Sequence, residues 1–366
     1  SSIGMPLRAA GVPVEIMPRG ANLVSDVRGT LAYLKRQRPS VYLPQCLFSM
    51  YFAAGVAGAQ GLPWVLAMHS DDPDYWALAD ALRPEQRAGR LVAVSKQLSH
   101  DVVERGLATA PVMIPYGVHV GDRQAAWKDA PFLIAYSGRM VEEQKRLSRV
   151  VDVLLEACRR DPRIQVVLFG DGPERQLAEQ RVVEAGLADR IRFTGRLTPE
   201  AVHSELQRCQ CIVLMSDYEG LPVALLEAMA QGVVPVVRSI PSGVPELVDN
   251  EATGLLVGDD VESAVIALTR LLGDAALWEQ CSKGAYEKVR AEYNADISYA
   301  GWVSLLAELA EQCPDGIDLQ LPKVIELPPH DPRLDRGYPP PPKPLPPPPS
   351  FMTRLKSAVK RRLLGR

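Results

Sequence analysis

Short runs of β-branched residues alternate with longer amphipathic stretches along most of this 366-residue chain, and this alternation restricts it to an α/β fold. Strands and helices that alternate at this spacing are typical of strand–helix–strand units, whose strands pair in parallel. A polar stretch around residues 122–129 divides the alternation into two blocks. The strands that we expect are Val12–Met17, Ser40–Leu43, Trp64–Met68, Leu91–Val94 and Val112–Ile114 in the first block, and Leu133–Tyr136, Ile164–Phe169, Ile191–Phe193, Ile212–Met215 and Val234–Val237 in the second.

Helical patterns fill the intervals between these strands and continue beyond the last one. A chain of this length can build two domains with separate cores. We therefore expect two doubly wound domains, in which ligands bind beyond the carboxyl ends of the strands, here in the cleft between the domains. The helices that we expect are Val24–Arg38, Lys96–Arg105, Leu147–Arg159, Glu174–Ala185, Pro199–Arg208, Leu221–Gln231, Val261–Leu272, Ala275–Tyr293 and Ile297–Gln312.

Charge and cysteine usage exclude some classes of function. The net charge is −3, but residues 350–366 hold six Lys and Arg and no acid, so the rest of the chain carries −9. A weakly acidic body is unsuited to general nucleic-acid binding. The six cysteines are scattered, and the lone pair Cys209 and Cys211 lacks the second pair of a zinc site, so we expect buried reduced thiols and no metal.

The composition changes towards the C-terminus. Of the 32 prolines, 13 lie between Pro322 and Pro349. We expect a proline-rich linker over residues 317–349. Because proline fixes φ and lacks an amide hydrogen, its segment Tyr338–Pro349 should be a semi-rigid polyproline II spacer, with a ligand for an SH3-like module as the alternative. As a helix, residues 350–366 would combine an apolar face with basic flanks, which is typical of a helix on an anionic membrane surface. The alternatives are a solvated tail and a helix that docks on a partner.

The segment Ser216–Gly232 carries the residues with the clearest chemistry. Gly220 allows close approach of a backbone to a ligand and Pro222 suits the first turn of a helix, so the amides there would face outward at a helix N-terminus, where phosphate binds. Glu219 and Glu227 lie roughly 12 Å apart at the helical rise per residue, and each can accept hydrogen bonds from the hydroxyls of a sugar or a ribose. The alternatives are a helix-dipole partner for Glu219 and a buried salt bridge for Glu227.

Two cations follow the predicted strand Leu133–Tyr136. Arg139 and Lys145 are six residues apart, and two fixed cations can stabilise negative charge on phosphate oxygens without a metal. An exposed loop pair is the alternative, since Arg146 and Arg149 crowd the same stretch.

A histidine ends the predicted strand Trp64–Met68. His69 would face the cleft from the carboxyl end of that strand, and the alternative is a satisfied core histidine. The acids that follow, Asp71, Asp72 and Asp74, are expected to cap the next helix rather than to hold a metal.

Together these segments resemble one family, the retaining glycosyltransferase family 4, which is also described as glycosyl transferases group 1. The resemblance runs from about Pro63 to Trp302. Its main element is the Glu-x7-Glu pattern within Glu219–Ala230. The other matching segments are Ile114-Pro-Tyr-Gly-Val118, Tyr136-Ser-Gly-Arg139 with Lys145, Phe169-Gly-Asp-Gly-Pro173, Phe193-Thr-Gly195, Gly243-Val-Pro-Glu-Leu-Val and Gly254-Leu-Leu-Val.

The resemblance implies a GT-B fold of two Rossmann-like domains. The N-terminal acceptor domain would cover residues 1–128, the nucleotide-sugar donor domain residues 129–295, and a helix at residues 296–316 would cross back to the first domain. By resemblance, the catalytic residues are His69, Arg139, Lys145 and Glu219, with Arg139 and Lys145 on the diphosphate, Glu219 on the donor sugar and Glu227 on the ribose. The donor-binding residues that it implies are Gly138, Arg139, Lys145, Gly170, Asp171, Gly172, Arg196, Glu219, Gly220, Leu221, Pro222, Leu225 and Glu227.

The family also implies the reaction. It is the transfer of a sugar, with retention of anomeric configuration, from a UDP- or GDP-sugar to a saccharide or lipid-linked acceptor, in glycolipid or surface-polysaccharide biosynthesis. The resemblance implies no metal and no cofactor. We expect a cytoplasmic protein, peripheral on the inner face of the membrane through residues 350–366.

The chain departs from the family pattern at its start. Members open with a strand, a glycine-rich loop and a helix, whereas residues 1–10 already resemble the end of that helix, with Gly11 as its C-cap. We expect a chain truncated at its start, and the alternative is a divergent domain without that strand. A sugar-nucleotide epimerase or phosphorylase is disfavoured by the Glu-x7-Glu segment and the two cations. A catalytically silent nucleotide-sugar-binding or scaffold protein of the same fold stays open.

Overall fold

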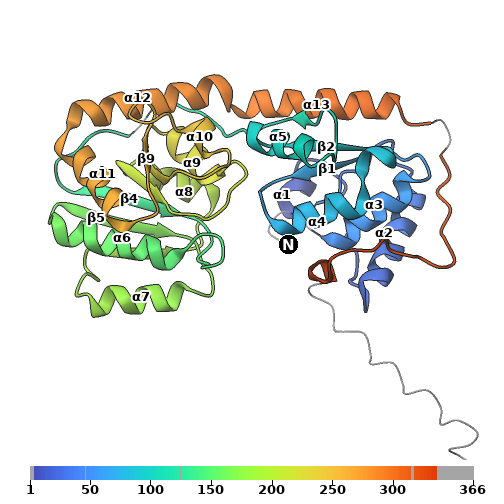
Figure 1. Ribbon diagram of the computed structural model, residues 1–366, viewed down its shortest axis with the longest axis horizontal. Helices are drawn as coiled ribbons and strands as arrows, with labels where there is room; N and C mark the ends of the chain where they lie inside the picture. Colours follow the sequence, from blue (N-terminus) through green and yellow to red (C-terminus); the bar gives the residue numbers. More distant parts are fainter. Residues whose placement is uncertain (1–3, 46, 124, 315–316, 336–366) are drawn as a thin grey trace, which may run out of the picture.

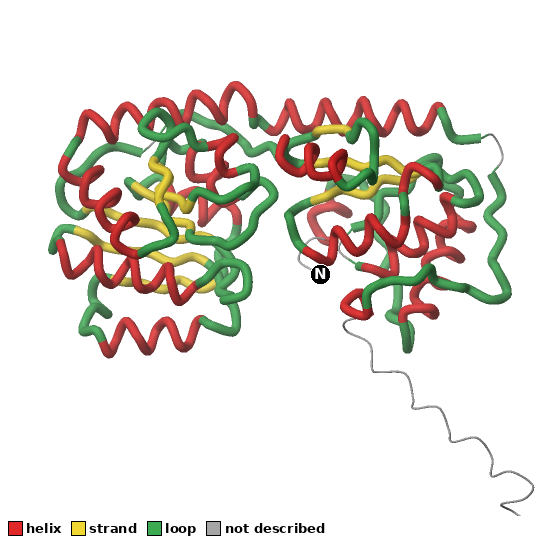
Figure 2. The backbone as a smooth tube through the Cα atoms, viewed as in Figure 1, coloured by secondary structure: helices red, strands yellow, loops and turns green. Residues whose placement is uncertain are grey.

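The computed structural model describes residues 4–335 apart from 46, 124, 315 and 316, and these form two α/β domains that lie side by side (Figure 1). Both sheets are parallel and are covered by helices (Figure 2), which confirms the predicted fold class. The N-terminal domain contains α1 (Gly4–Ala9), α2 (Leu23–Gln37), α3 (Phe48–Gly58), β1 (Trp64–Met68), α4 (Pro73–Leu82), η1 (Pro84–Gln86), β2 (Gly89–Ala93), α5 (Lys96–Glu104) and β3 (Val112–Met113).

The N-terminal sheet has the order β1-β2-β3, with Trp64 opposite Gly89 and Val92 opposite Val112. All five residues of β1 are buried, because helices cover both faces of the strand, and this is why β1 is a continuous apolar run. Trp64, Leu66 and Met68 belong to the main core, whereas Val65 and Ala67 belong to a second, smaller cluster on the opposite face.

The C-terminal domain is built on a six-stranded sheet with the order β6-β5-β4-β7-β8-β9. The strand order reverses between β4 and β7, which makes their carboxyl ends the topological switch point of the sheet. The elements are β4 (Phe132–Ser137), α6 (Leu147–Arg160), β5 (Ile164–Phe169), α7 (Arg175–Glu184), β6 (Ile191–Gly195), α8 (Pro199–Leu206), β7 (Cys211–Leu214), α9 (Val223–Met229), β8 (Val234–Arg238), α10 (Val244–Leu247), β9 (Leu255–Val257), α11 (Val261–Gly273) and α12 (Ala275–Glu292).

Helix α13 (Ala295–Glu311) carries the chain back from the C-terminal to the N-terminal domain (Figure 1). Leu305 and Leu309 of α13 pack in the second cluster with Val65, Ala67 and Ile114. Asn294 is the N-cap residue of this helix: its side chain accepts from the Asp296 amide, and its backbone bridges to Val118. The chain passes between the domains twice, once near Val118 and once near Asn294, and these two connecting segments therefore contact each other.

Residues 317–335 lie against the N-terminal domain, and we call this segment the C-terminal strap. Leu319, Ile325 and Leu334 are buried, and η2 (Pro332–Asp335) ends the segment. Residues 317–335, the first part of the linker expected over residues 317–349, therefore pack on the domain, because these apolar side chains gain free energy by burial. Residues 336–349 and the predicted helix at 350–366 lie outside the described residues. No helix among those described is both long and apolar enough to cross a bilayer.

Two predicted strands are wrong. Residues 12–17 form no strand, since Pro13 lacks an amide hydrogen and Ile16 is 75% exposed. Ser40–Leu43 is reduced to one bridge between Tyr42 and Trp64.

The other strands and the predicted helices are confirmed to within a few residues, and Gly11 ends α1 with φ +79°. Helix α3 was not predicted. It is buried on nearly all sides, so its sequence has no amphipathic period.

Candidate active site

An ion pair joins the two loops that follow the strands at the switch point. Lys145, in the loop after β4, donates from Nζ to Oε1 of Glu219, in the loop after β7, over 2.6 Å. The Lys145 side chain is 13% exposed and that of Glu219 only 6%. Because two opposite charges are buried together, the site is locally neutral, and removing either one would leave the other charge without compensation.

Gln144 connects the same two loops and holds Arg139. Its side-chain carbonyl accepts a hydrogen bond from the Arg139 guanidinium, and its Nε2 donates to the Tyr218 carbonyl over 3.2 Å. The backbone carbonyl of Gln144 accepts from the Asp217 amide at 2.9 Å. Arg139 is exposed apart from this contact. Gln144 thus fixes the base of an arginine whose remaining donors are open to the cleft.

Four charged side chains behind Lys145 and Glu219 form an ion-pair network. Arg238 contacts Asp217 at 2.7 Å and Asp259 at 3.2 Å, and Arg146 contacts Asp217 at 3.3 Å and also Asp259. The hydrogen bond from Arg146 lowers the pKa of Asp259. Arg146 has a left-handed backbone with φ +48°, which turns its side chain into the network next to Lys145. The crowding of arginines noted in the sequence is therefore structural.

Three of the predicted donor-binding glycines hold two loops together. A Cβ on Gly170 would lie 1.9 Å from the Gly138 carbonyl oxygen, and one on Gly172 would lie 2.3 Å from that of Met140. Gly170 also has φ +125°, a conformation that side chains disfavour. The loop after β5, with Asp171, therefore lies directly on the loop that carries Arg139. Asp171 accepts from the Gly172 amide, and Arg196, after β6, is exposed.

The two domains touch at Gly220. It forms a bridge with Ser70, and a Cβ at this position would lie 2.2 Å from the His69 carbonyl oxygen. A larger residue would push the domains apart, so glycine allows the Glu219 loop to press against the end of β1. Beside this contact, the Glu246 carboxylate of α10 accepts from the amide of Gln97 in the first turn of α5 over 3.0 Å.

His69 lies on the N-terminal side of that contact. Its Nδ1 is 2.5 Å from the Tyr116 hydroxyl, and its ring stacks on Tyr116 with centroids 5.8 Å apart and meets Tyr75 edge-on. Burial lowers the pKa of His69 below its usual range, so the imidazole is neutral at pH 7. The structure thus places a neutral, oriented histidine next to the loop that carries Glu219.

Glu227 faces a different pocket from Arg139. It lines a pocket of about 560 Å³ with Gly117, Val118, His203 and others from the first crossing and from α8. Burial raises the pKa of Glu227, and no hydrogen bond or ion pair to its carboxylate is found among the described residues. The Glu227 carboxylate is therefore free to accept hydrogen bonds from a ligand in that pocket.

Arg139 lines a second pocket, of about 190 Å³, with Asp72, Asp74, Tyr218 and Arg333. Burial, and then the carboxylates of Asp72 and Glu143, raise the pKa of Tyr218 to about 12. Asp72 is the N-cap of α4, as expected from the sequence.

The predicted helix Leu221–Gln231 is shorter in the structure than expected. It is α9, which begins at Val223, so Pro222 is its N-cap residue rather than part of its first turn. Leu221 and Leu225 are buried in the core, so neither side chain is open to a ligand.

Sequence reasoning missed three residues of this region. The sequence indicates Gln144 only by its place next to Lys145. Glu246 lies within the segment Gly243-Val-Pro-Glu-Leu-Val, which matches the family without an implied role. Arg333 comes from the C-terminal strap, and nothing in its sequence neighbourhood indicated the cleft.

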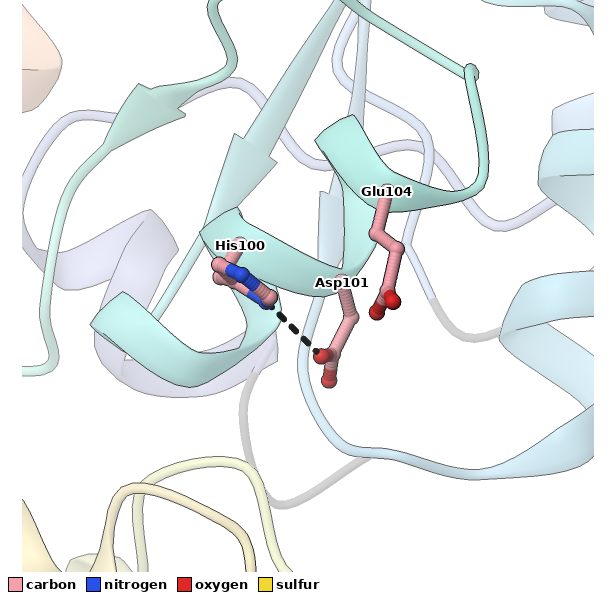
Figure 3. A group of neighbouring side chains, drawn as sticks. All are labelled: His100, Asp101 and Glu104. Carbon is pink, nitrogen blue, oxygen red and sulfur yellow. Dashed lines mark ion pairs between the residues drawn. The ribbon is translucent and has the colours of Figure 1, made fainter.

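The metal prediction can be compared with one group of side chains. Among the described residues, His100, Asp101 and Glu104 of α5 offer ligand atoms within 4.8 Å of one another (Figure 3). His100 and Glu104 are exposed, and Asp101 already accepts from Gln97 over 2.8 Å. The group lies on a helix surface and involves none of the predicted site residues, so we assign no metal to it.

Comparison with known proteins gives a family match within the C-terminal domain. The family model described as Glycosyl transferases group 1 matches residues 121–288. The amylovoran biosynthesis glycosyltransferase AmsK of Erwinia amylovora is 27% identical over 235 residues, which are 60% of this chain and 56% of that protein. An exopolysaccharide phosphotransferase of Streptomyces coelicolor is 31% identical over 179 residues, 48% of this chain but 19% of that protein. The chain spans less than two thirds of the length of these relatives.

A solved structure extends the likeness to both domains. Anabaena HepE in complex with UDP and glucose is similar with a TM-score of 0.70, over 83% of this chain and 88% of that one, at 16% identity. Likeness at that identity concerns the fold. Residues 121–288 are therefore a glycosyl transferases group 1 domain, within a chain that has the two-domain α/β fold of GT-B glycosyltransferases.

Proposed function

We propose that this protein is a retaining, metal-independent glycosyltransferase of family 4. It would move a sugar from a UDP- or GDP-sugar to a saccharide or lipid-linked acceptor in glycolipid or surface-polysaccharide assembly. The observation that carries the proposal is the buried Lys145–Glu219 pair at the switch point of the donor-domain sheet, with Arg139 on the same loop as Lys145.

The Lys145–Glu219 pair suits a nucleotide-sugar because a bound donor could give each of the two charged side chains a new partner. A diphosphate oxygen would take the place of the Glu219 carboxylate at Lys145, and sugar hydroxyls would take the place of the ammonium at Glu219. When the bond from the sugar to the diphosphate breaks, negative charge grows on the leaving oxygen. Arg139 and Lys145 would stabilise that charge without a metal.

The remaining predicted residues extend this arrangement on both sides. Glu227, with no partner among the described residues, would accept the ribose hydroxyls in the pocket that it shares with α8. His69 is neutral and held by Tyr116, so its other ring nitrogen can form a hydrogen bond to a hydroxyl of the reacting sugar. Retention of configuration is proposed from the family resemblance.

The test is direct binding followed by turnover. UDP-glucose, UDP-N-acetylglucosamine, UDP-galactose and GDP-mannose are screened for a rise in melting temperature, because a ligand of the folded state stabilises it. The donor that binds is then assayed for release of its nucleoside diphosphate. We expect one donor to raise the melting temperature and to be turned over. Binding with neither transfer nor hydrolysis would favour the catalytically silent alternative, and no binding by any donor would contradict the proposal.

We also propose that the protein lies on the cytoplasmic face of an anionic membrane through residues 350–366. This segment contains six basic residues and no acidic residue. A chain that ends at residue 349 should no longer sediment with vesicles that contain phosphatidylserine, whereas the full chain should do so in a salt-dependent way. Equal sedimentation of the two chains would exclude this attachment.

A further inference from the structure

The C-terminal strap is fixed to the N-terminal domain along its whole described length. Arg28 donates to the carbonyls of Pro322 and Lys323, and Lys35 donates to that of Leu319. Figure 1 shows the segment leaving α13, passing along the far side of the domain and returning beneath α4. The strap is therefore a built part of the domain.

The end of the strap is held most firmly. The His330 ring packs on Phe52 with centroids 4.8 Å apart, and Leu334 is fully buried. The Asp331 side chain accepts from the Arg333 amide over 2.9 Å and pairs with the Arg333 guanidinium at 3.0 Å. The backbone and side chains of residues 329–333 consequently have defined positions beside α4.

A pocket of about 810 Å³ lies between this end of the strap and α4. Its lining combines apolar side chains with carboxylates from α4, from the turn before α4 and from the strap, and with guanidinium groups from the strap and from the end of α5. The lining residues are Asp71, Pro73, Trp76, Ala77, Asp80, Ala81, Arg105, Pro329, His330, Asp331 and Arg333.

The charges around this pocket favour hydroxyl groups over phosphate. Three carboxylates face two guanidinium groups, and both cations are already engaged. Arg105 lies over the Trp76 ring at 4.1 Å, and Arg333 is paired with Asp331. A phosphate would find neither of these cations unengaged, whereas the lining carboxylates can still accept from the hydroxyls of a neutral sugar ring through their remaining lone pairs.

The pocket continues into the cleft. Pro73 and Arg333 line both this pocket and the smaller one that contains Arg139 and Tyr218. Arg333 is also 3.8 Å from Asp74, at the start of α4. A ring bound between the strap and α4 would therefore direct one edge towards the arginine on the donor side.

We propose that residues 329–333 of the strap and helix α4 form the acceptor subsite, and that it takes a neutral saccharide ring rather than a lipid phosphate. This inference rests on the proposed function and specifies its acceptor. Arg333 and Asp331 decide which rings fit, because they form the wall that faces α4.

The experiment measures saturation transfer by NMR from the full chain to three probes, methyl α-glucoside, methyl α-mannoside and methyl β-galactoside. Ala81→Trp and Ala77→Trp place an indole in the pocket from two positions of α4, and Ala110→Trp puts the same side chain at an exposed position that lines none of these pockets. We expect wild type and Ala110→Trp to bind at least one glycoside. The two α4 variants should bind that glycoside with an affinity lower by a factor of about ten or more. Farnesyl diphosphate should not displace the glycoside.

The outcomes separate this inference from the proposed function. The melting-temperature rise with the donor should persist in Ala81→Trp, since the donor side is untouched. Glycoside binding without any donor binding would remove the proposed reaction and leave a sugar pocket. No glycoside signal in wild type, unchanged binding in both α4 variants, or displacement by farnesyl diphosphate would overturn the acceptor subsite.

Discussion

The two walls of the cleft are built in different ways. One wall, which we call the donor wall after its proposed role, consists of loops that follow neighbouring strands, and its residues are held by ion pairs such as Lys145–Glu219 and by the stacking of Gly170 on Gly138. The opposite wall depends on a segment from the far end of the chain, where Arg28 contacts a residue 294 positions away. The donor wall thus joins loops of one domain, 74 positions apart at Lys145 and Glu219, and is held by charge. The opposite wall adds a segment 294 positions away from its contact at Arg28 and is held by apolar burial.

The largest effect should come from breaking the buried charge pair. Lys145→Ala leaves Glu219 buried without its partner and should lower the free energy of unfolding by about 3–5 kcal/mol. Lys288→Ala is the control, because Lys288 pairs with the exposed Asp249 and should cost at most about 1 kcal/mol. Urea denaturation measures both. Equal losses in the two variants would mean that the donor wall is not held by charge.

Arg139→Ala should separate activity from stability on the same wall. The side chain is exposed, so unfolding should change little, whereas turnover of the donor should fall about 10²–10³-fold if the guanidinium stabilises the leaving diphosphate. Arg192→Ala, an exposed arginine that pairs with Glu205, provides the control. Steady-state kinetics of both variants decide the matter, and wild-type turnover of Arg139→Ala would remove its catalytic role.

The opposite wall should be sensitive to apolar truncation. Leu334→Ala removes a fully buried side chain of the strap and should cost about 2–4 kcal/mol. Leu321→Ala, in the same strap but 40% exposed, should cost less than about 0.5 kcal/mol. Thermal unfolding followed by circular dichroism compares them. A strap that merely touches the domain would give two equally small shifts.

The glycine stacking of the donor wall should be sensitive to a single methyl group. Gly170→Ala brings a Cβ against the Gly138 carbonyl oxygen and forces a side chain to φ +125°, which should cost about 1–3 kcal/mol. Gly186→Ala also has positive φ, +69°, but meets nothing within 4 Å, so its loss should be about 1 kcal/mol or less. If both melting temperatures fall alike, only backbone strain matters and the contact between the loops does not.

The two walls should respond to pH with opposite signs. Burial raises the pKa of Glu227, so the folded state binds its proton more tightly and this residue lowers stability as pH rises above about 4.5. Burial lowers the pKa of His69, so the unfolded state takes up the proton first and stability falls as pH drops below about 6.5. Glu227→Gln should thus be slightly more stable than wild type at pH 7. His69→Gln should lose less stability than wild type as the pH falls below about 6.5. Melting curves from pH 4.5 to 8 with slopes unchanged in both variants would contradict this.

The sequence predicts the donor wall better than the opposite wall. Strands such as Ile164–Phe169 and the Glu219–Glu227 segment were predicted because their signals lie within a few residues of one another. Helix α3 was missed because burial on nearly all sides removes the amphipathic period. Arg333 was missed because its position depends on the burial of Leu319, Ile325 and Leu334 against residues distant in the sequence, and no local pattern encodes such contacts.

The bridge between Val118 and Asn294 has a mechanical consequence. The chain crosses between the domains twice, and at this bridge Val118 donates to the Tyr293 carbonyl while Ala295 donates to that of Val118, both over 2.9 Å. Two crossings fastened at one place act as a pivot, so a rotation about it leaves both sheets and the strap unchanged. Such a rotation would separate Gly220 from Ser70 and Glu246 from Gln97, which contact each other across the cleft. A rotation about this bridge would therefore change the width of the cleft without unfolding either domain.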